Sequence, residues 1–176
     1  MYLENLYLSL GNKLLEQPSI DLLTANGLPE VAHVDLFENQ YLNEEREEVY
    51  PLPAIFIEFA STQSSQKSKG IQQNTETIRF HVEWKKKRST AMNKTNQTKA
   101  LLPLRLVDAI NIILSKFQGL RLVGRELDTE PEGYPVHILE YEGVFENLDT
   151  ERYKEGYQEV KDTETKIEKT GLKHRL

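Results

Sequence analysis

Apolar residues near the start of the chain recur about once per helical turn. They form one stripe of a helix predicted over residues 2–16, made of four leucines: Leu3, Leu6, Leu10 and Leu14. Pro18 is expected to end this helix, and Ser19–Gly27 is expected to form one short helical turn. Gly27 and Pro29 then interrupt the pattern before a strand predicted over residues 31–37.

The middle of the chain carries two strong strand patterns. Leu52–Ala60 is nearly all apolar, which predicts a central strand covered on both faces. Thr75–Trp84 alternates, which predicts a half-buried strand with one apolar face (Ile78, Phe80, Val82, Trp84) and one polar face (Thr77, Arg79, His81, Glu83). Between them, Ser61–Asn74 is rich in Ser, Gln and Lys and is predicted to be a long polar loop.

The second half of the chain predicts one helix followed by two strands. An amphipathic helix is expected over residues 101–118, with Pro103 in its first turn and Gly119 as its end. Strands are expected over residues 120–127 and 136–145, joined by a turn rich in Pro and Gly. The predicted fold class is therefore α+β: a mostly antiparallel mixed sheet, built on a long central hairpin and packed against the N-terminal and central amphipathic helices.

Length and composition predict one α+β domain over residues 1–148. The 176 residues, 38% of them hydrophobic, are enough to bury one core and leave little room for a second domain. Residues 149–176 form a polar tail with too few apolar residues to offset the entropy of ordering it alone. The tail is expected to be disordered or to become ordered against a neighbour.

The overall charge and the absence of cysteine exclude several classes of protein. A net charge of -6 argues against a protein whose main role is to bind the phosphates of duplex nucleic acid. Without cysteine there are no disulfides, thiolate zinc sites or cysteine nucleophiles, which fits a reducing compartment. No window resembles a signal peptide or a membrane span, so the protein is expected to stay inside the producing cell unless it is exported or released.

The residues that could support catalysis are scattered. The four histidines fall in separate predicted elements without metal-ligand spacing: His33, His81, His137 and His174. No phosphate-binding glycine loop, dinucleotide fingerprint or serine nucleophile motif occurs in the sequence. We therefore expect no catalytic residues, no metal site and no cofactor.

One enzymatic alternative stays open. Glu83-Trp84-Lys85 ends a predicted strand before a linker and helix, and it resembles half of the Glu-x-Lys motif of restriction-endonuclease-type nucleases. Such a site needs a second carboxylate on the preceding strand to share a divalent cation, and Glu58 is the only candidate there. The Pro-Asp element of that family is missing.

Two charged segments flank the predicted hairpin. Residues 85–99 contain six basic residues and no acid, so this segment is either a solvated connection or a phosphate contact. The acidic run before the hairpin is expected to be an exposed loop, and in a ring it would line a channel through which DNA slides without sticking: Glu44, Glu45, Glu47 and Glu48.

The central hairpin resembles that of phage tail terminator and tail completion proteins. The similarity is carried by YPLPAIFIEFASTQ, a polar segment reaching KGIQQN, and TIRFHVEW. The family plan of a leading helix, a hairpin-based sheet, a second helix and two closing strands matches residues 1–147. The resemblance implies a ring of six subunits that caps the tail tube, stops its polymerisation and offers a docking face to the neck or head.

The implied partners are other copies of the chain, the tail tube protein and a neck or head completion protein, with DNA passing through unbound and no membrane contact. The implied location is the virion, after assembly in the host cytoplasm. Interface candidates are residues of the two segments that follow the hairpin strands: Ser64, Gln66, Lys67, Lys69, Gly70, Lys85, Lys86, Lys87 and Arg88. A small adaptor that binds another protein through residues 61–74 is the remaining alternative.

Overall fold

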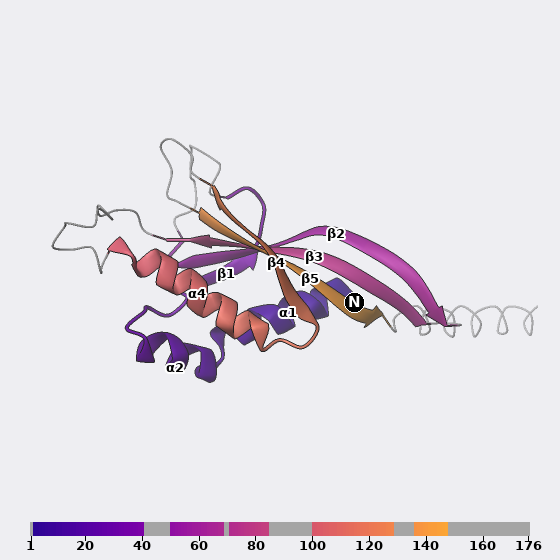
Figure 1. Ribbon diagram of the computed structural model, residues 1–176, viewed down its shortest axis with the longest axis horizontal. Helices are drawn as coiled ribbons and strands as arrows, with labels where there is room; N and C mark the ends of the chain where they lie inside the picture. Colours follow the sequence, from indigo (N-terminus) through magenta and orange to yellow (C-terminus); the bar gives the residue numbers. More distant parts are fainter. Residues whose placement is uncertain (1, 41–49, 69–70, 85–99, 129–135, 148–176) are drawn as a thin grey trace, which may run out of the picture.

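The computed structural model describes residues 2–40, 50–68, 71–84, 100–128 and 136–147. These residues form one five-stranded sheet with three helices against one of its faces (Figure 1). The helices are α1 (Tyr2–Leu15), α2 (Gln17–Ala25) and α4 (Leu102–Ser115), and the strands are β1 (His33–Leu36), β2 (Ala54–Ser68), β3 (Ile71–Glu83), β4 (Leu120–Asp128) and β5 (Val136–Asn147). The predicted α+β class is confirmed.

The helices follow the predicted apolar stripes, with two corrections, the first of which is that Leu3, predicted on the buried stripe of α1, is 43% exposed. In α1 the residues Leu6, Leu10 and Leu14 are buried, as the leucine spacing predicts. The single turn expected after Pro18 is instead the nine-residue helix α2, and Pro18 lies in its first turn. Proline is tolerated there because the first amide groups of a helix have no acceptor within the helix. Gly27, with a φ of 62°, follows α2 as predicted.

The sheet order is β1-β2-β3-β5-β4, and every pair except β1 with β2 is antiparallel. The central pair places Phe56 opposite His81 and Glu58 opposite Arg79. The next pair places Arg79 opposite Glu140. Rows of side chains from three strands therefore run across each face of the sheet.

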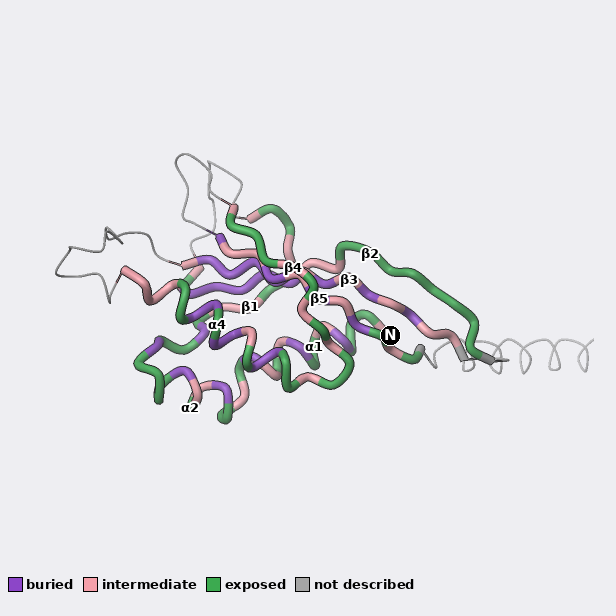
Figure 2. Tube along the Cα trace, viewed as in Figure 1, coloured by how far each residue is buried: buried purple, intermediate pink, exposed green. Residues whose placement is uncertain are grey.

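The main core lies between the helices and the sheet (Figure 2). On the sheet side it is built from alternate residues of β2, β3 and β5: Ile55, Ile57, Ile78, Phe80, Val82, Leu139 and Tyr141. The helix α4 contributes buried residues along one stripe, from Leu106 to Leu114. A smaller cluster covers the other face, where Ala54, Phe56 and Val136 are buried. Both faces of the start of β2 are thus covered, as its apolar sequence predicts.

The predicted polar loop over residues 61–74 is wrong. β2 continues to Ser68 and β3 begins at Ile71, with cross-strand pairs along almost the whole segment. Short hydroxyl and amide side chains can pair across strands, and β5 supports the other side of β3 as far as Gln72. The polar residues therefore form a strand ladder, although their composition is typical of a loop.

The segment that was expected to be a loop is instead an extended arm. We define the arm as residues 61–68 of β2, 71–77 of β3 and 143–147 of β5. Figure 1 shows these strands curving away beyond the helices. Irregular register at Phe59/Ser61 marks a β-bulge where β2 enters the arm, and bulges of this kind bend a strand and increase its twist.

Candidate interaction surface

The arm has a surface chemistry unlike the rest of the sheet. Large apolar side chains are absent from its described stretches 61–67 and 72–77, which carry mainly Ser, Thr, Gln and Asn. Residues 61–67 of β2 are all exposed, as Figure 2 shows along this strand. The β2 and β3 strands of the arm therefore add little to the hydrophobic core and present hydrogen-bonding groups to their surroundings, whereas Phe145 of β5 packs against the core.

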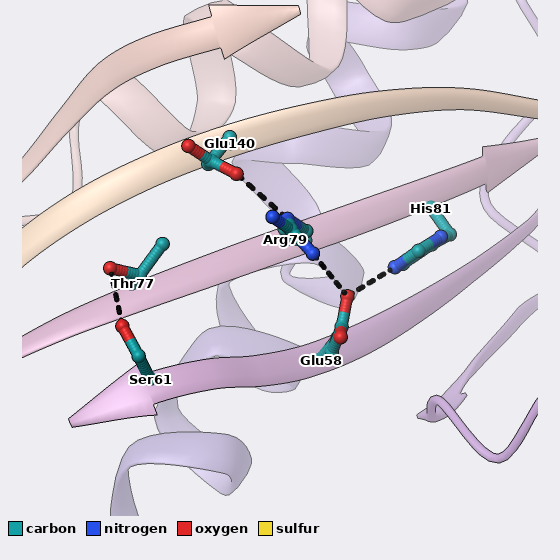
Figure 3. Close-up of polar contacts among 6 residues, drawn as sticks. All are labelled: Glu58, Ser61, Thr77, Arg79, His81 and Glu140. Atoms are coloured by element: carbon teal, nitrogen blue, oxygen red, sulfur yellow. Dashed lines mark hydrogen bonds and ion pairs between the residues drawn. The ribbon is translucent and has the colours of Figure 1, made fainter. Parts of the chain in front are cut away.

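Cross-strand side-chain pairs hold the two arm strands in register. The Ser61 hydroxyl donates to Thr77 Oγ1 at 3.0 Å on the face away from the helices (Figure 3). On the helix side, Ser64 donates to Asn74 Oδ1 at 2.9 Å. Near the tip, Lys67 forms an ion pair with Glu146 of β5, so all three arm strands are linked.

Buried polar groups mark the root of the arm. Glu76 is fully buried, and its Oε2 accepts a hydrogen bond from the Thr62 hydroxyl at 2.5 Å. The buried hydroxyl of Tyr2 lies beside the Glu76 carboxylate and Asn74, although neither this hydroxyl nor Glu76 Oε1 makes a hydrogen bond of good geometry among the described residues. Burial raises the pKa of Tyr2, and the nearby Glu76 carboxylate raises it further. Tyr2, the first residue of α1, therefore contacts the arm through buried polar groups.

A row of charged side chains crosses the face of the sheet opposite the helices (Figure 3). Arg79 of β3 donates from Nε to Glu140 of β5 at 2.7 Å and lies 3.7 Å from Glu58 of β2. The Arg79 side chain is 41% exposed, so each pair is screened by water and contributes about 0.2–1 kcal/mol. One row further along, Arg121 of β4 pairs with Glu142.

His81 connects this charged row to the small aromatic cluster. Its Nε2 lies 3.0 Å from Glu58 Oε2 (Figure 3), and its ring stacks on Phe37 with centroids 4.1 Å apart. Only 3% of His81 is exposed. Burial lowers its pKa, while the neighbouring Glu58 carboxylate partly opposes this change.

Aromatic contacts also position the chain at Tyr50, where the described residues resume before β2. The Tyr50 ring stacks on His33 and meets Phe56 edge to face, with centroids 5.5 and 5.0 Å away. The Tyr50 hydroxyl donates to Glu83 Oε2 at 2.5 Å. Glu83 is fully buried. These contacts give His33 and Glu83 a structural role on the face opposite the helices, where Glu83 is buried instead of lying on the exposed polar face expected for its strand.

The two carboxylates of the nuclease alternative do not converge. Glu58 lies opposite Arg79 and Glu83 lies opposite Ala54, so they are four residues apart along the sheet, or about 13 Å. Glu58 contacts Arg79 and His81, whereas Glu83 accepts from Tyr50. Lys85 lies outside the described residues. Within the described ranges, no group of three His, Asp or Glu residues is arranged to hold a metal ion.

The structure separates the predicted interface residues into two groups. Ser64, Gln66 and Lys67 lie on the outer part of β2, in a strand instead of the expected loop. The other candidates fall outside the described residues: Lys69, Gly70, Lys85, Lys86, Lys87 and Arg88. The channel-lining candidates Glu44, Glu45, Glu47 and Glu48 and the tail 149–176 also lie outside them.

The charged row across β2, β3 and β5 was not predicted. Its members are far apart in sequence, and only the strand register brings Glu58, Arg79 and Glu140 together. A partial signal was available, because Arg79 and His81 fall on the polar face of an alternating strand. Once two strands are paired, oppositely charged residues on facing positions favour that register.

Comparisons with known proteins returned nothing that identifies the chain. No protein-family model matches it, and no curated protein matches it significantly. Of the helices in the described ranges, none combines the length and apolarity needed to cross a bilayer. The features that bear on function are therefore the arm, the sheet and the sequence resemblance.

Proposed function

We propose that this chain is a structural virion protein, a tail terminator that forms a ring at the head-proximal end of a phage tail tube. The observation that carries the proposal is the arm, a three-stranded extension whose β2 and β3 strands are polar and add little to the core. Projections of this kind commonly make contacts between subunits, because strand edges and polar side chains can pair with a neighbour. The hairpin resemblance supports the same function.

In this function the ring consists of about six copies, stops tube polymerisation and presents a docking face to the neck or head. Its partners are other copies, the tail tube protein and a neck or head completion protein. An acidic chain of net charge -6 suits a channel through which DNA must pass without binding. The protein requires no cofactor for this role, and its location is the virion after assembly in the host cytoplasm.

The experiment is a mass measurement on the full chain and on a variant with a shortened arm. In the variant, Asn-Gly replaces residues 65–73, so that the facing pair Ser64 and Asn74 flanks a two-residue hairpin turn. The wild type, alone or with the tail tube protein, is expected to reach about six times the 20.4 kDa chain mass. The shortened variant is expected to stay a single chain with a wild-type circular dichroism spectrum.

Asp21→Asn is the matched control, since Asp21 is exposed on α2 and this helix lies away from the arm in Figure 1. This variant should assemble like the wild type. A wild-type chain that never exceeds a dimer under either condition contradicts the ring. A shortened variant that is folded and still assembles shows that the arm is not the contact.

A further inference from the structure

Most of one side of β2 has no neighbouring strand in the described part of the chain. β1 pairs only with Ala54–Ile57, and the Phe37 amide adds one more bond to Ile57. The backbone from Glu58 to Ser68 therefore presents an open edge on that side. Between Ala60 and Gln66 this edge has no charged residue, although charges are the usual guard against unwanted strand pairing.

The open side of the sheet also carries exposed apolar residues. We define the first edge as β1 together with residues 58–68 of β2. Leu36 of β1 is 40% exposed. A Cβ atom on Gly11 of α1 would lie 3.8 Å from Val34 of β1, so this side of α1 runs beside the strand. Leu8 and Leu15, one turn before and after Gly11, are each about half exposed.

The opposite side of the sheet ends in β4, which pairs only with β5 among the described strands. We define this strand as the second edge. Val123, at a register shift, and Leu127 are 43% and 50% exposed. Arg125 of β4 pairs with Asp108 of α4. Leu127 lies two residues beyond Arg125 along β4, and Leu104 lies one turn before Asp108 along α4, so the two leucines flank this ion pair. Leu104 is also half exposed, which extends the apolar character of this edge onto α4.

An acidic stretch adjoins the first edge, and an exposed arginine lies at one end of the second. Residues 30–38, which contain β1, carry Glu30, Asp35 and Glu38 and no Lys or Arg. β4 carries two arginines and two acids, Glu126 and Asp128, and Glu126 follows Arg125 directly. Arg125 is paired with Asp108 of α4, whereas the Arg121 side chain, at the end of the strand without acids, is 77% exposed and pairs with the half-exposed Glu142.

We propose that the first edge of one copy pairs with the second edge of the next copy, so that the sheet continues from subunit to subunit. The two edges are formed by different strands at opposite ends of the sheet order, so the contact is head to tail and repeats in one direction. Each copy offers both edges, which allows a closed ring. The inference rests on the proposed function and names the surfaces through which the ring closes.

Because the chain contains no cysteine, the only thiols in a crosslinking experiment are those introduced by mutation. Gln63→Cys places a thiol on the exposed first edge, and Val123→Cys places one on the second edge. A mixture of the two full-length variants with a short bis-maleimide is expected to give covalent dimers. Each variant alone is expected to give about tenfold less, since the edges of one kind do not meet each other.

Thr24→Cys supplies the background, because Thr24 is exposed on α2, which belongs to neither edge. Its mixture with Val123→Cys should crosslink no more than either variant alone. Equal crosslinking of Val123→Cys by itself would indicate a symmetric contact and overturn the head-to-tail pairing. Absence of crosslinks in the Gln63→Cys and Val123→Cys mixture, under conditions where the chain assembles, would also overturn it.

A second variant separates this inference from the ring itself. Val123→Lys adds a charge to the second edge and is expected to weaken self-association at least about tenfold, with the melting temperature unchanged. Thr24→Lys is the matched control and should assemble normally. If wild type forms the ring and Val123→Lys assembles equally well, the edge contact is wrong and the ring stands. If wild type never assembles, both proposals fail.

Discussion

His81 is a titratable side chain whose surroundings favour its neutral form. Its ring is buried against Phe37, and burial is the main cause that lowers its pKa. Glu58 and Asp128 act in the opposite direction, whereas Arg79 adds to the lowering. His137 of β5 shows a pKa lowered by burial as well. Two histidines therefore link the stability of the sheet to pH.

The sign of this dependence follows from the lowered pKa. At a pH above about 6.5, the pKa of a histidine in the unfolded chain, His81 is neutral in both the folded and the unfolded state, and its contribution to stability is complete. As the pH falls below that value, the unfolded chain binds the proton first and the folded state loses stability. We expect the wild-type melting temperature to fall between about pH 7 and pH 5, and His81→Gln to reduce this fall. An unchanged pH dependence in His81→Gln would contradict the assignment.

The buried Glu76 side chain can be tested by substitution. One oxygen of this fully buried carboxylate accepts from Thr62, and the Tyr2 hydroxyl lies beside the carboxylate. Glu76→Gln keeps an acceptor for the Thr62 hydroxyl and removes the charge of a fully buried group. Thermal unfolding should show a gain of about 1 kcal/mol in stability.

The matched control is Glu146→Gln, because Glu146 is half exposed and pairs with Lys67 near the arm tip. A surface pair of this kind contributes about 0–1 kcal/mol, so the control should melt within a few degrees of the wild type. If Glu76→Gln is less stable than the wild type, the root of the arm depends on the carboxylate.

Among the elements, β5 depends on a glycine at the point where the arm begins. A Cβ atom on Gly143 would lie 2.6 Å from Phe145 Cζ and 3.0 Å from Leu120 Cδ2. Phe145 packs against the main core, so its ring has little room to move. Gly143→Ala is therefore expected to lose about 1–3 kcal/mol of stability in denaturant unfolding.

Gly124 of β4 provides a close comparison on the neighbouring strand. A Cβ atom there would meet Glu140 Cβ at 3.6 Å, which is an ordinary contact. Gly124→Ala should be neutral or slightly stabilising, because alanine restricts the unfolded chain. Equal losses in both variants would show that the Phe145 ring adapts and that the close approach does not matter.

The elements also show which parts of the fold are readable from local pattern. The leucine spacing predicted α1, and the apolar run with the following alternation predicted the cores of β2 and β3. The arm was missed because a strand with polar residues on both faces has no apolar periodicity to distinguish it from a loop. The contacts of Glu58, Arg79 and Glu140 depend on strand register, which no local pattern specifies.

In the described residues, the region that stabilises the fold differs from the regions through which we propose that copies meet. The core between the helices and the sheet supplies the burial that stabilises the fold. The arm and the two sheet edges carry the surfaces through which we propose that copies meet. Because these surfaces lie outside the core, a variant that blocks assembly should still fold, which makes the crosslinking and mass experiments interpretable.

The polar composition of the arm has a consequence for how the protein can change over evolutionary time. Exposed Ser, Thr and Gln residues of β2 between Ser61 and Gln66 contribute little burial, so exchanging them for similar residues leaves the fold nearly undisturbed. A core position such as Phe80 or Leu10 has no such freedom. The arm can therefore follow sequence changes in a partner rapidly, while the scaffold that carries it stays constant.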